Sequence, residues 1–187
     1  MPTAIWKVLT RLKGHVRIPV TLQMQDQLHI STPGQMIFDR VVVAFSVVCE
    51  NHYGRRFAGF ADLTDLAICH PNSEELRTVQ DSIDARPPCL QALIASNHFL
   101  LSHKEPGDDF VRVYSSTVGP LSDHAKLQLS LIYGREIRDV RVRFSIAHRQ
   151  PAGSNFCGPL VCAFMSEILD GRSPENIVYC KEEQQRQ

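Results

Sequence analysis

The chain has 187 residues, enough for one domain to bury its own core and too few for two domains of ordinary size. Its 20 Lys and Arg residues balance its 20 Asp and Glu residues, so it lacks the basic excess typical of proteins that bind nucleic acid. No apolar run is long enough to cross a membrane, so we expect an intracellular protein of the nucleus or cytoplasm that binds neither nucleic acid nor membrane.

The N-terminal half predicts few elements. A short β-like run covers residues 5–12, and a helix is expected to begin at Thr32, with Pro33 at its first position and Gln35 completing a capping box. We expect this helix to end near Gly54. Its predicted core-facing residues have helical spacing and are Ile37, Val41, Ala44, Phe45 and Val48.

Another helix is predicted to begin near Asn72 or Ser73 and to stop before two prolines at residues 87–88. The apolar runs 90–101 and 110–114 follow, separated by the polar Pro-Gly turn 104–109, which together predict an antiparallel hairpin.

Three elements are expected in the C-terminal part. Ser122 is positioned to cap a helix that ends at Gly134, and residues 140–146 alternate as a strand with one buried face. The last helix is expected to begin near Asn155, which can cap it, and to end at Gly171. Its apolar positions form one face and are Cys157, Leu160, Val161, Phe164, Met165, Ile168 and Leu169.

Cys157 is the candidate nucleophile of this sequence. A thiol in the first turn of a helix feels the positive end of the helix dipole and unpaired backbone N–H groups, both of which favour the thiolate. A nucleophilic cysteine also needs an imidazole within hydrogen-bond reach, and His98 lies in the predicted hairpin. The alternative is that Cys157 is a small apolar core residue and His98 a structural histidine.

The remaining cysteines and histidines show no pattern of a metal site. The six cysteines include no Cys-x-x-Cys pair, and the other seven histidines lack metal-ligand spacing. We therefore expect buried free thiols, without a disulfide framework, a zinc site or any other cofactor. Asp108 and Asp109 are expected to solvate the hairpin turn rather than to serve His98.

The order of motifs in residues 28–180 resembles the ubiquitin-like-protein-specific (SUMO/NEDD8-type) cysteine proteases, particularly their divergent, transposon-associated relatives. The motifs that carry this resemblance are Asn-His-Phe-Leu-Leu (97–101), Val-Arg-Val-Tyr-Ser-Ser (111–116), Ile-Tyr-Gly (132–134), Arg-Gln-Pro-Ala-Gly-Ser-Asn-Phe-Cys-Gly (149–158) and Asp-Gly-Arg-Ser-Pro (170–174).

The resemblance implies an α+β, papain-like cysteine protease fold: a central, mostly antiparallel sheet flanked by helices, with the nucleophile at the N-terminus of a buried helix. It implies a protease domain over residues 28–180, an N-terminal extension at 1–27 and a disordered tail at 181–187. In these terms His98 matches the general base, Cys157 the nucleophile and Gln150 the oxyanion-hole residue.

This sequence departs from the family pattern at two supporting positions. Ser115 occupies the position of the acid that orients the histidine, and Phe156 stands where the family has Asp before the cysteine; Gln150 is also one residue further from the cysteine than is common. A neutral hydroxyl can orient an imidazole but cannot stabilise its positive charge as a carboxylate does.

Two functions follow from the resemblance. The first is a cysteine peptidase or isopeptidase that cleaves after the C-terminal glycine of a ubiquitin-like modifier, with the modifier or its conjugates as partner. The second is a catalytically impaired module of the same fold that binds such a modifier or another protein. A third possibility is an unrelated α+β domain whose cysteine belongs to the core. The sequence does not predict an oligomeric state.

Overall fold

The computed structural model describes residues 6–9, 19–53, 89–133 and 140–176. Within these ranges the elements in chain order are β1 (Trp6–Leu9), β2 (Pro19–Leu22), α1 (Met24–Ser31), α2 (Asp39–Tyr53), β3 (Cys89–Ala95), β4 (His98–Lys104), β5 (Val111–Ser115), α5 (Asp123–Tyr133), β6 (Val142–Ile146), α6 (Cys157–Leu169) and the short 3-10 helix η3 (Pro174–Asn176). The helix expected after Asn72 and the tail expected at 181–187 lie outside the described residues.

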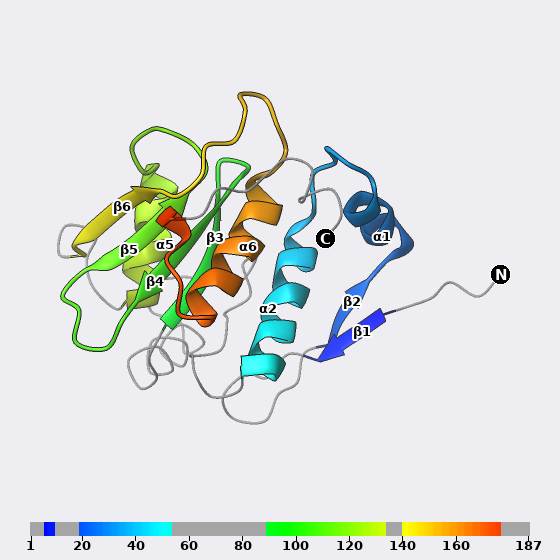
Figure 1. Cartoon of the computed structure of the whole chain (residues 1–187), viewed down its shortest axis with the longest axis horizontal. Coiled ribbons are helices and arrows are strands. Elements are labelled where there is room, and N and C mark those ends of the chain that lie inside the picture. Colours follow the sequence, from blue (N-terminus) through cyan, green and yellow to red (C-terminus); the bar gives the residue numbers. More distant parts are fainter. Residues whose placement is uncertain (1–5, 10–18, 54–88, 134–139, 177–187) are drawn as a thin grey trace.

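The centre of the fold is a four-stranded sheet in the order β3-β4-β5-β6. The first two pairs are antiparallel and the β5–β6 pair is parallel, so the predicted mostly antiparallel sheet is confirmed. Helices α2 and α6 lie on one face of this sheet, and α5 lies on the other (Figure 1). The α+β class expected from the sequence is therefore correct.

Each face of the sheet has its own hydrophobic core, because neighbouring residues of a strand point to opposite faces. On β4, Phe99 and Leu101 join the core beneath α2 and α6, whereas Leu100 joins the core beneath α5. Helix α6 contributes most of its apolar face to the first core, including the fully buried Phe164 and Met165. The helix that begins with Cys157 is thus fixed firmly against the sheet.

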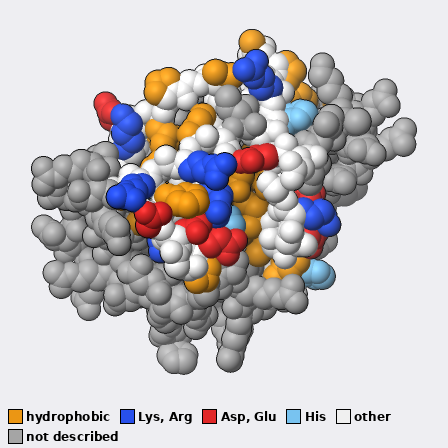
Figure 2. Space-filling model, turned by 60° about the vertical axis from the view of Figure 1, so that its left-hand side comes forward, with side chains coloured by type: hydrophobic (Ala, Val, Ile, Leu, Met, Phe, Trp, Pro, Cys, Tyr) orange, Lys and Arg blue, Asp and Glu red, His pale blue; other side chains and the backbone are white. Residues whose placement is uncertain are grey.

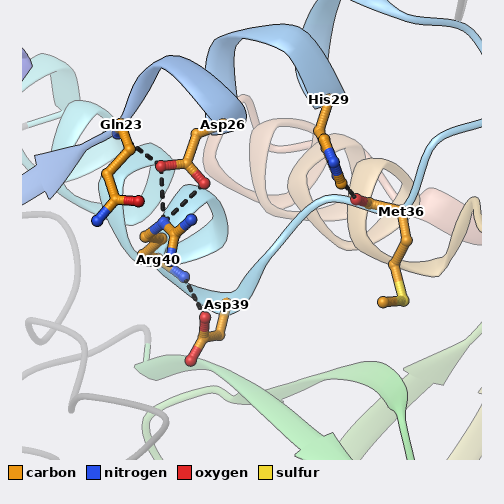
Figure 3. Close-up of polar contacts among 6 residues, drawn as sticks. All are labelled: Gln23, Asp26, His29, Met36, Asp39 and Arg40. Carbon is orange, nitrogen blue, oxygen red and sulfur yellow. Dashed lines mark hydrogen bonds and ion pairs between the residues drawn. The ribbon is translucent and has the colours of Figure 1, made fainter.

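A small N-terminal unit, β1, β2 and α1, packs beside α2 (Figure 1). Its anchor is Asp26, which is completely buried (0% exposed). The Gln23 backbone N–H donates to the Asp26 carboxylate (2.7 Å), and so does Arg40 Nε (2.6 Å), as Figure 3 shows. Since removing one partner of a buried charge pair typically costs ~3–5 kcal/mol, this contact ties α1 to the start of α2.

The segment between α1 and α2 is held by a second set of contacts. His29 Nδ1 lies 2.7 Å from the Met36 carbonyl oxygen (Figure 3). The His29 ring also stacks on Phe38, with 4.7 Å between the ring centroids. The Arg40 guanidinium also lies over the Phe38 ring, 4.6 Å from its centroid. The route of residues 32–38 is therefore well defined.

The predicted start of α2 was wrong. Thr32 is the C-cap of α1 and not an N-cap, and α2 begins only at Asp39. Gly34 has a φ of +80°, which a right-handed helix cannot accommodate, so Pro33 and Gly34 form a turn between the two helices. A capping box does exist here, but it is made by Gln23 and Asp26 at the start of α1.

The predicted core face of α2 is correct except at its end. Ile37, Val41 and Ala44 are buried, but Val48 is 53% exposed and Val47 takes its place in the core. Val47 and Val48 are adjacent and identical, so the sequence does not show which of them faces the core. The boundary expected after residue 27 stays a prediction; it would fall within α1.

The predicted start of α5 and the predicted end of α6 are confirmed. Ser122 Oγ accepts a hydrogen bond from the Ala125 backbone N–H (3.2 Å), as an N-cap should. At the end of α6, the Gly171 N–H donates to the Ile168 carbonyl (3.0 Å) and the Arg172 N–H to the Glu167 carbonyl (2.8 Å). With Gly171 at a φ of +78°, these two bonds form a Schellman motif.

Charged side chains on the face shown in Figure 2 lie next to partners of opposite sign and around hydrophobic side chains. Arg112 pairs with Asp108 (2.9 Å) and also lies over the Phe110 ring, and Arg141 pairs with Asp109.

Among the described residues, no helix is both long and apolar enough to cross a bilayer.

Candidate active site

His98 is positioned by a tight hairpin turn. The apolar run 90–101 was predicted as a single strand, but it forms two strands, β3 and β4, joined by Ser96 and Asn97. Both turn residues have positive φ, 54° and 60°, which is the pattern of a type I′ turn and reverses the chain within two residues. His98 is the first residue after this turn and pairs with Ala95, so its backbone is fixed at the end of the sheet.

The end of β5 lies beside the start of β4, because the two strands are antiparallel. Ser115 is the last residue of β5, and its Oγ lies 3.2 Å from His98 Nε2. The structure therefore brings together two of the predicted site residues. Thr117 Oγ1 lies at the same distance, 3.2 Å, from His98 Nε2. The sequence did not point to Thr117, because its contact with His98 depends on how the chain turns after β5.

No carboxylate accompanies His98 among the described residues. Burial lowers the pKa of His98, and no charged neighbour contributes to this shift. Asp108 and Asp109 lie at the opposite end of β4, where they pair with Arg112 and Arg141. The expectation that these two acids serve the turn and not His98 is correct.

Gln150 connects the end of β5 to the loop before α6. Its backbone N–H donates to the Ser116 carbonyl (2.9 Å), and its Oε1 accepts from the Ser116 hydroxyl (2.8 Å). Its Nε2 donates to the Ser154 carbonyl (3.1 Å), which uses one of the two amide protons. No acceptor among the described residues takes the second amide proton, which an oxyanion-hole donor would use. That role stays a prediction.

Cys157 is the first residue of α6 and is 4% exposed. The predicted position in the first turn of this helix is therefore correct. Asn155, however, does not cap the helix, because α6 begins two residues later than Asn155 itself. Its amide instead donates to the Gly34 carbonyl (3.3 Å), and the N-cap is Phe156, whose side chain makes no capping hydrogen bond.

Gly158 lets the start of α6 lie very close to Ile37, in the segment before α2. A Cβ at Gly158 would be only 2.5 Å from Ile37 Cγ1 and 3.4 Å from Phe99 Cδ2. Phe99 follows His98 and Gly158 follows Cys157, so the neighbours of the two candidate catalytic residues lie close together. The helix start with the thiol and the strand start with the imidazole thus meet at one end of the fold.

Two other described cysteines have the environment of structural thiols. Burial raises the pKa of Cys49 to about 11, with the nearby Asp170 carboxylate adding to the effect. Burial also raises the pKa of Cys162. These thiols stay protonated at neutral pH and are poor nucleophiles. Both pack with the core beneath α2 and α6, and the expectation of free, structural thiols is correct for them.

A metal centre is not found among the described residues. No group of three or more His, Cys, Asp or Glu side chains in residues 6–9, 19–53, 89–133 and 140–176 is arranged to hold a metal ion. The candidate site itself offers a thiol, an imidazole and hydrogen-bonding amide and hydroxyl groups.

The sequence matches no protein-family model, and no curated protein matches it in sequence. Solved structures do match it in three dimensions. The SUMO protease Ulp1 with its catalytic cysteine oxidised to a sulfinic acid aligns with a TM-score of 0.68 and 14% identity, over 95% of this chain and 84% of that one.

Two further structures show the same relationship. The Ulp1-like SUMO protease catalytic domain of Chaetomium thermophilum aligns with a TM-score of 0.66 and 16% identity, over all of this chain and 81% of that one. The Ulp1 protease domain in complex with Smt3, the yeast orthologue of SUMO, aligns with a TM-score of 0.61 and 13% identity, over 99% and 85% of the two chains. At these identities the likeness establishes the fold. This chain has the papain-like cysteine protease fold of the Ulp1-type proteases, which excludes an unrelated α+β architecture.

Proposed function

We propose that this protein is a cysteine peptidase or isopeptidase that cleaves after the C-terminal glycine of a ubiquitin-like modifier. One observation carries the proposal: in a fold shared with SUMO proteases, Cys157 begins the buried helix α6 and His98 begins the strand that this helix covers. A thiol and an imidazole in these positions are the minimum for nucleophilic catalysis.

In this proposal His98 takes the proton from the Cys157 thiol, and the resulting thiolate attacks the carbonyl carbon of the modifier's last glycine. The tetrahedral oxyanion accepts hydrogen bonds from the free amide proton of Gln150 and from backbone N–H groups. His98 then returns its proton to the leaving amine, and a thioester forms on Cys157. Water hydrolyses the thioester with His98 as base, which releases the modifier with a free carboxylate and regenerates the thiol. The mechanism uses no metal or cofactor.

Ser115 takes the place of the orienting acid in this mechanism, since its hydroxyl is 3.2 Å from His98 Nε2. A neutral hydroxyl leaves the imidazolium without a stabilising negative charge, so we expect slower turnover than in a protease with a carboxylate. A cysteine tolerates this loss better than a serine, because the pKa of a thiol is already close to neutral. Ser115 therefore reduces the rate without abolishing the chemistry.

The second candidate function is a binding module for a ubiquitin-like modifier or another protein. Two observations favour it: no carboxylate contacts His98 among the described residues, and Cys157 is only 4% exposed. A modifier protein of this class can be the partner in both functions, in line with the Ulp1 domain that was solved in complex with Smt3.

Covalent labelling separates the two functions. The purified protein is incubated with ubiquitin, SUMO and NEDD8 probes that carry a thiol-reactive C-terminus, and adducts are detected by mass spectrometry. The proposal expects an adduct on Cys157 with one probe, no adduct in Cys157→Ala, and slower labelling in His98→Ala. Cys49→Ala is the matched control, because this thiol is buried in the core and should leave labelling unchanged. A folded protein that no probe labels would favour the binding module.

A further inference from the structure

Ser115 and Thr117 form a small hydroxyl cluster beside His98 Nε2, and the two residues also hydrogen-bond to each other. The Thr117 backbone N–H donates to Ser115 Oγ (3.0 Å), and Ser115 Oγ donates to the Thr117 carbonyl (3.1 Å). The two hydroxyl oxygens lie 3.3 Å apart, and each is 3.2 Å from His98 Nε2. Ser115 is 1% exposed, whereas Thr117 reaches the surface. Two hydroxyls therefore occupy the space beside one ring nitrogen.

Counting protons in this cluster determines which form of the ring fits. An unprotonated Nε2 has one lone pair and accepts one good hydrogen bond, so the second hydroxyl oxygen would face that lone pair without a proton between them. A protonated Nε2 can share its N–H between both oxygens as a three-centre bond. The Ser115 proton then goes to the Thr117 carbonyl, and the Thr117 proton goes to Ser115 Oγ or to solvent. Only the ring with a protonated Nε2 therefore places a proton between Nε2 and both hydroxyl oxygens.

The other ring nitrogen is left free. His98 Nδ1 has no hydrogen-bond partner among the described residues. In a neutral imidazole with its proton on Nε2, the Nδ1 nitrogen carries the lone pair that can accept a proton. The cluster thus specifies both the nitrogen that is protected and the nitrogen that is available as the base.

We propose that Thr117 is a positioning residue that acts together with Ser115: the two hydroxyls hold His98 in the Nε2-protonated tautomer and leave Nδ1 as the nitrogen that accepts a proton. The proposal rests on the proposed function for its catalytic meaning, but the tautomer itself is a property of the folded protein. It assigns to a pair of hydroxyls, one of them outside the predicted site, the orienting part of the role of a carboxylate.

The electrostatic part of that role is missing. Burial lowers the pKa of His98, and no carboxylate opposes this effect among the described residues. The imidazole is therefore neutral at physiological pH, which keeps Nδ1 ready to accept a proton.

The test compares the wild-type protein with Thr117→Val, which keeps the shape of the side chain and removes only its hydroxyl. Long-range ¹H–¹⁵N NMR correlations of the His98 ring report which nitrogen carries the proton, and the ring N–H signal reports its protection from water. Thr21→Val is the matched control, since Thr21 is also exposed but lies in β2. For activity, kcat and KM are measured on a modifier carrying a fluorogenic C-terminal group.

We expect a protected Nε2–H signal in the wild type and in Thr21→Val, and its broadening or loss in Thr117→Val. We also expect kcat to fall about tenfold in Thr117→Val with KM unchanged, as for one lost hydrogen bond to the base. A proton on Nδ1 in the wild type would overturn the proposal, and so would a Thr117→Val variant whose ring N–H signal matches the wild type. If the ring signals behave as expected but no modifier is cleaved, the positioning role stands and the proposed activity fails.

Discussion

Replacing Gly158 by Ala tests how closely the start of α6 must approach Ile37, in the segment before α2. The added Cβ would come within 2.5 Å of Ile37 Cγ1 and 2.9 Å of Ile37 Cδ1, closer than carbon atoms can lie without movement. Ile37 is 7% exposed and belongs to the core beneath α2 and α6, so its side chain has little room to move away. The contact with Phe99 at 3.4 Å is ordinary packing.

The size and sign of the effect follow from two opposing terms. Overpacking a core typically costs ~1–3 kcal/mol, whereas Gly→Ala inside a helix gains at most ~1 kcal/mol. Gly158→Ala should therefore lower the free energy of unfolding by roughly 1–2 kcal/mol in the wild-type background. Ile37→Ala alone should cost ~2–5 kcal/mol, because it leaves a cavity. In the Ile37→Ala background the obstructing atoms are gone, so Gly158→Ala should become neutral or stabilising.

The assay is urea unfolding of the four proteins of this double-mutant cycle, followed by far-UV circular dichroism. The reasoning predicts a change of sign for Gly158→Ala between the two backgrounds, which is a coupling of at least ~1 kcal/mol. Equal effects in both backgrounds, or a stabilising Gly158→Ala in the wild type, would refute the close approach of α6 to the segment before α2.

Two further variants test local features of the sheet. Burial, together with the positive charge of Arg112, lowers the pKa of His103 from 6.5 to about 4, while Asp108 opposes the shift. Because the folded pKa lies below the unfolded one, protonation favours unfolding: His103 should reduce the free energy of unfolding by up to about 3 kcal/mol as the pH falls from 6.5 to 4. Urea titrations of His103→Leu should lack this part of the pH dependence, and parallel curves for both proteins would contradict the prediction. Asn97→Val should lower the unfolding free energy by ~1–2 kcal/mol because its φ is 60°, whereas Asn97→Gly should stay near the wild type; equal thermal unfolding midpoints for both variants would argue against the type I′ turn.

The C-terminal part of the fold could be predicted well from the sequence. The last helix has a regular apolar face and a glycine at its end, and the structure confirms both. Ser122 likewise marks the start of α5. These signals are local, since each depends on the spacing of residues within one element and on the chemistry of one cap.

The N-terminal part could not be predicted in the same way. Helix α1 exposes apolar side chains and buries a charged one. Met24 and Leu28 are 62% and 60% exposed, whereas Asp26 is completely buried against Arg40. A search for an apolar face therefore overlooks it. The partner that makes the burial of Asp26 possible lies fourteen residues away in the sequence, in another helix. Tertiary contact, not local pattern, determines this element.

The candidate site shows the same division. Cys157 and His98 were found from the residues and the resemblance together, and Ser115 was correctly expected near the imidazole. Thr117 was missed, because its contact depends on how the chain turns after β5. The turn at Ser96 and Asn97 was missed as well, since this pair lacks the Gly that usually marks a two-residue hairpin loop.

The central claim is that Cys157 and His98 form a working protease site for a modifier with a C-terminal glycine. Its most direct test is incubation of the protein with a modifier that was joined through an isopeptide bond to a lysine-containing peptide, with mass analysis of the products. The account predicts release of the modifier ending in its C-terminal glycine and of the free lysine, with neither product formed by Cys157→Ala. An intact conjugate that is bound but not cleaved by the folded wild-type protein would contradict the protease function.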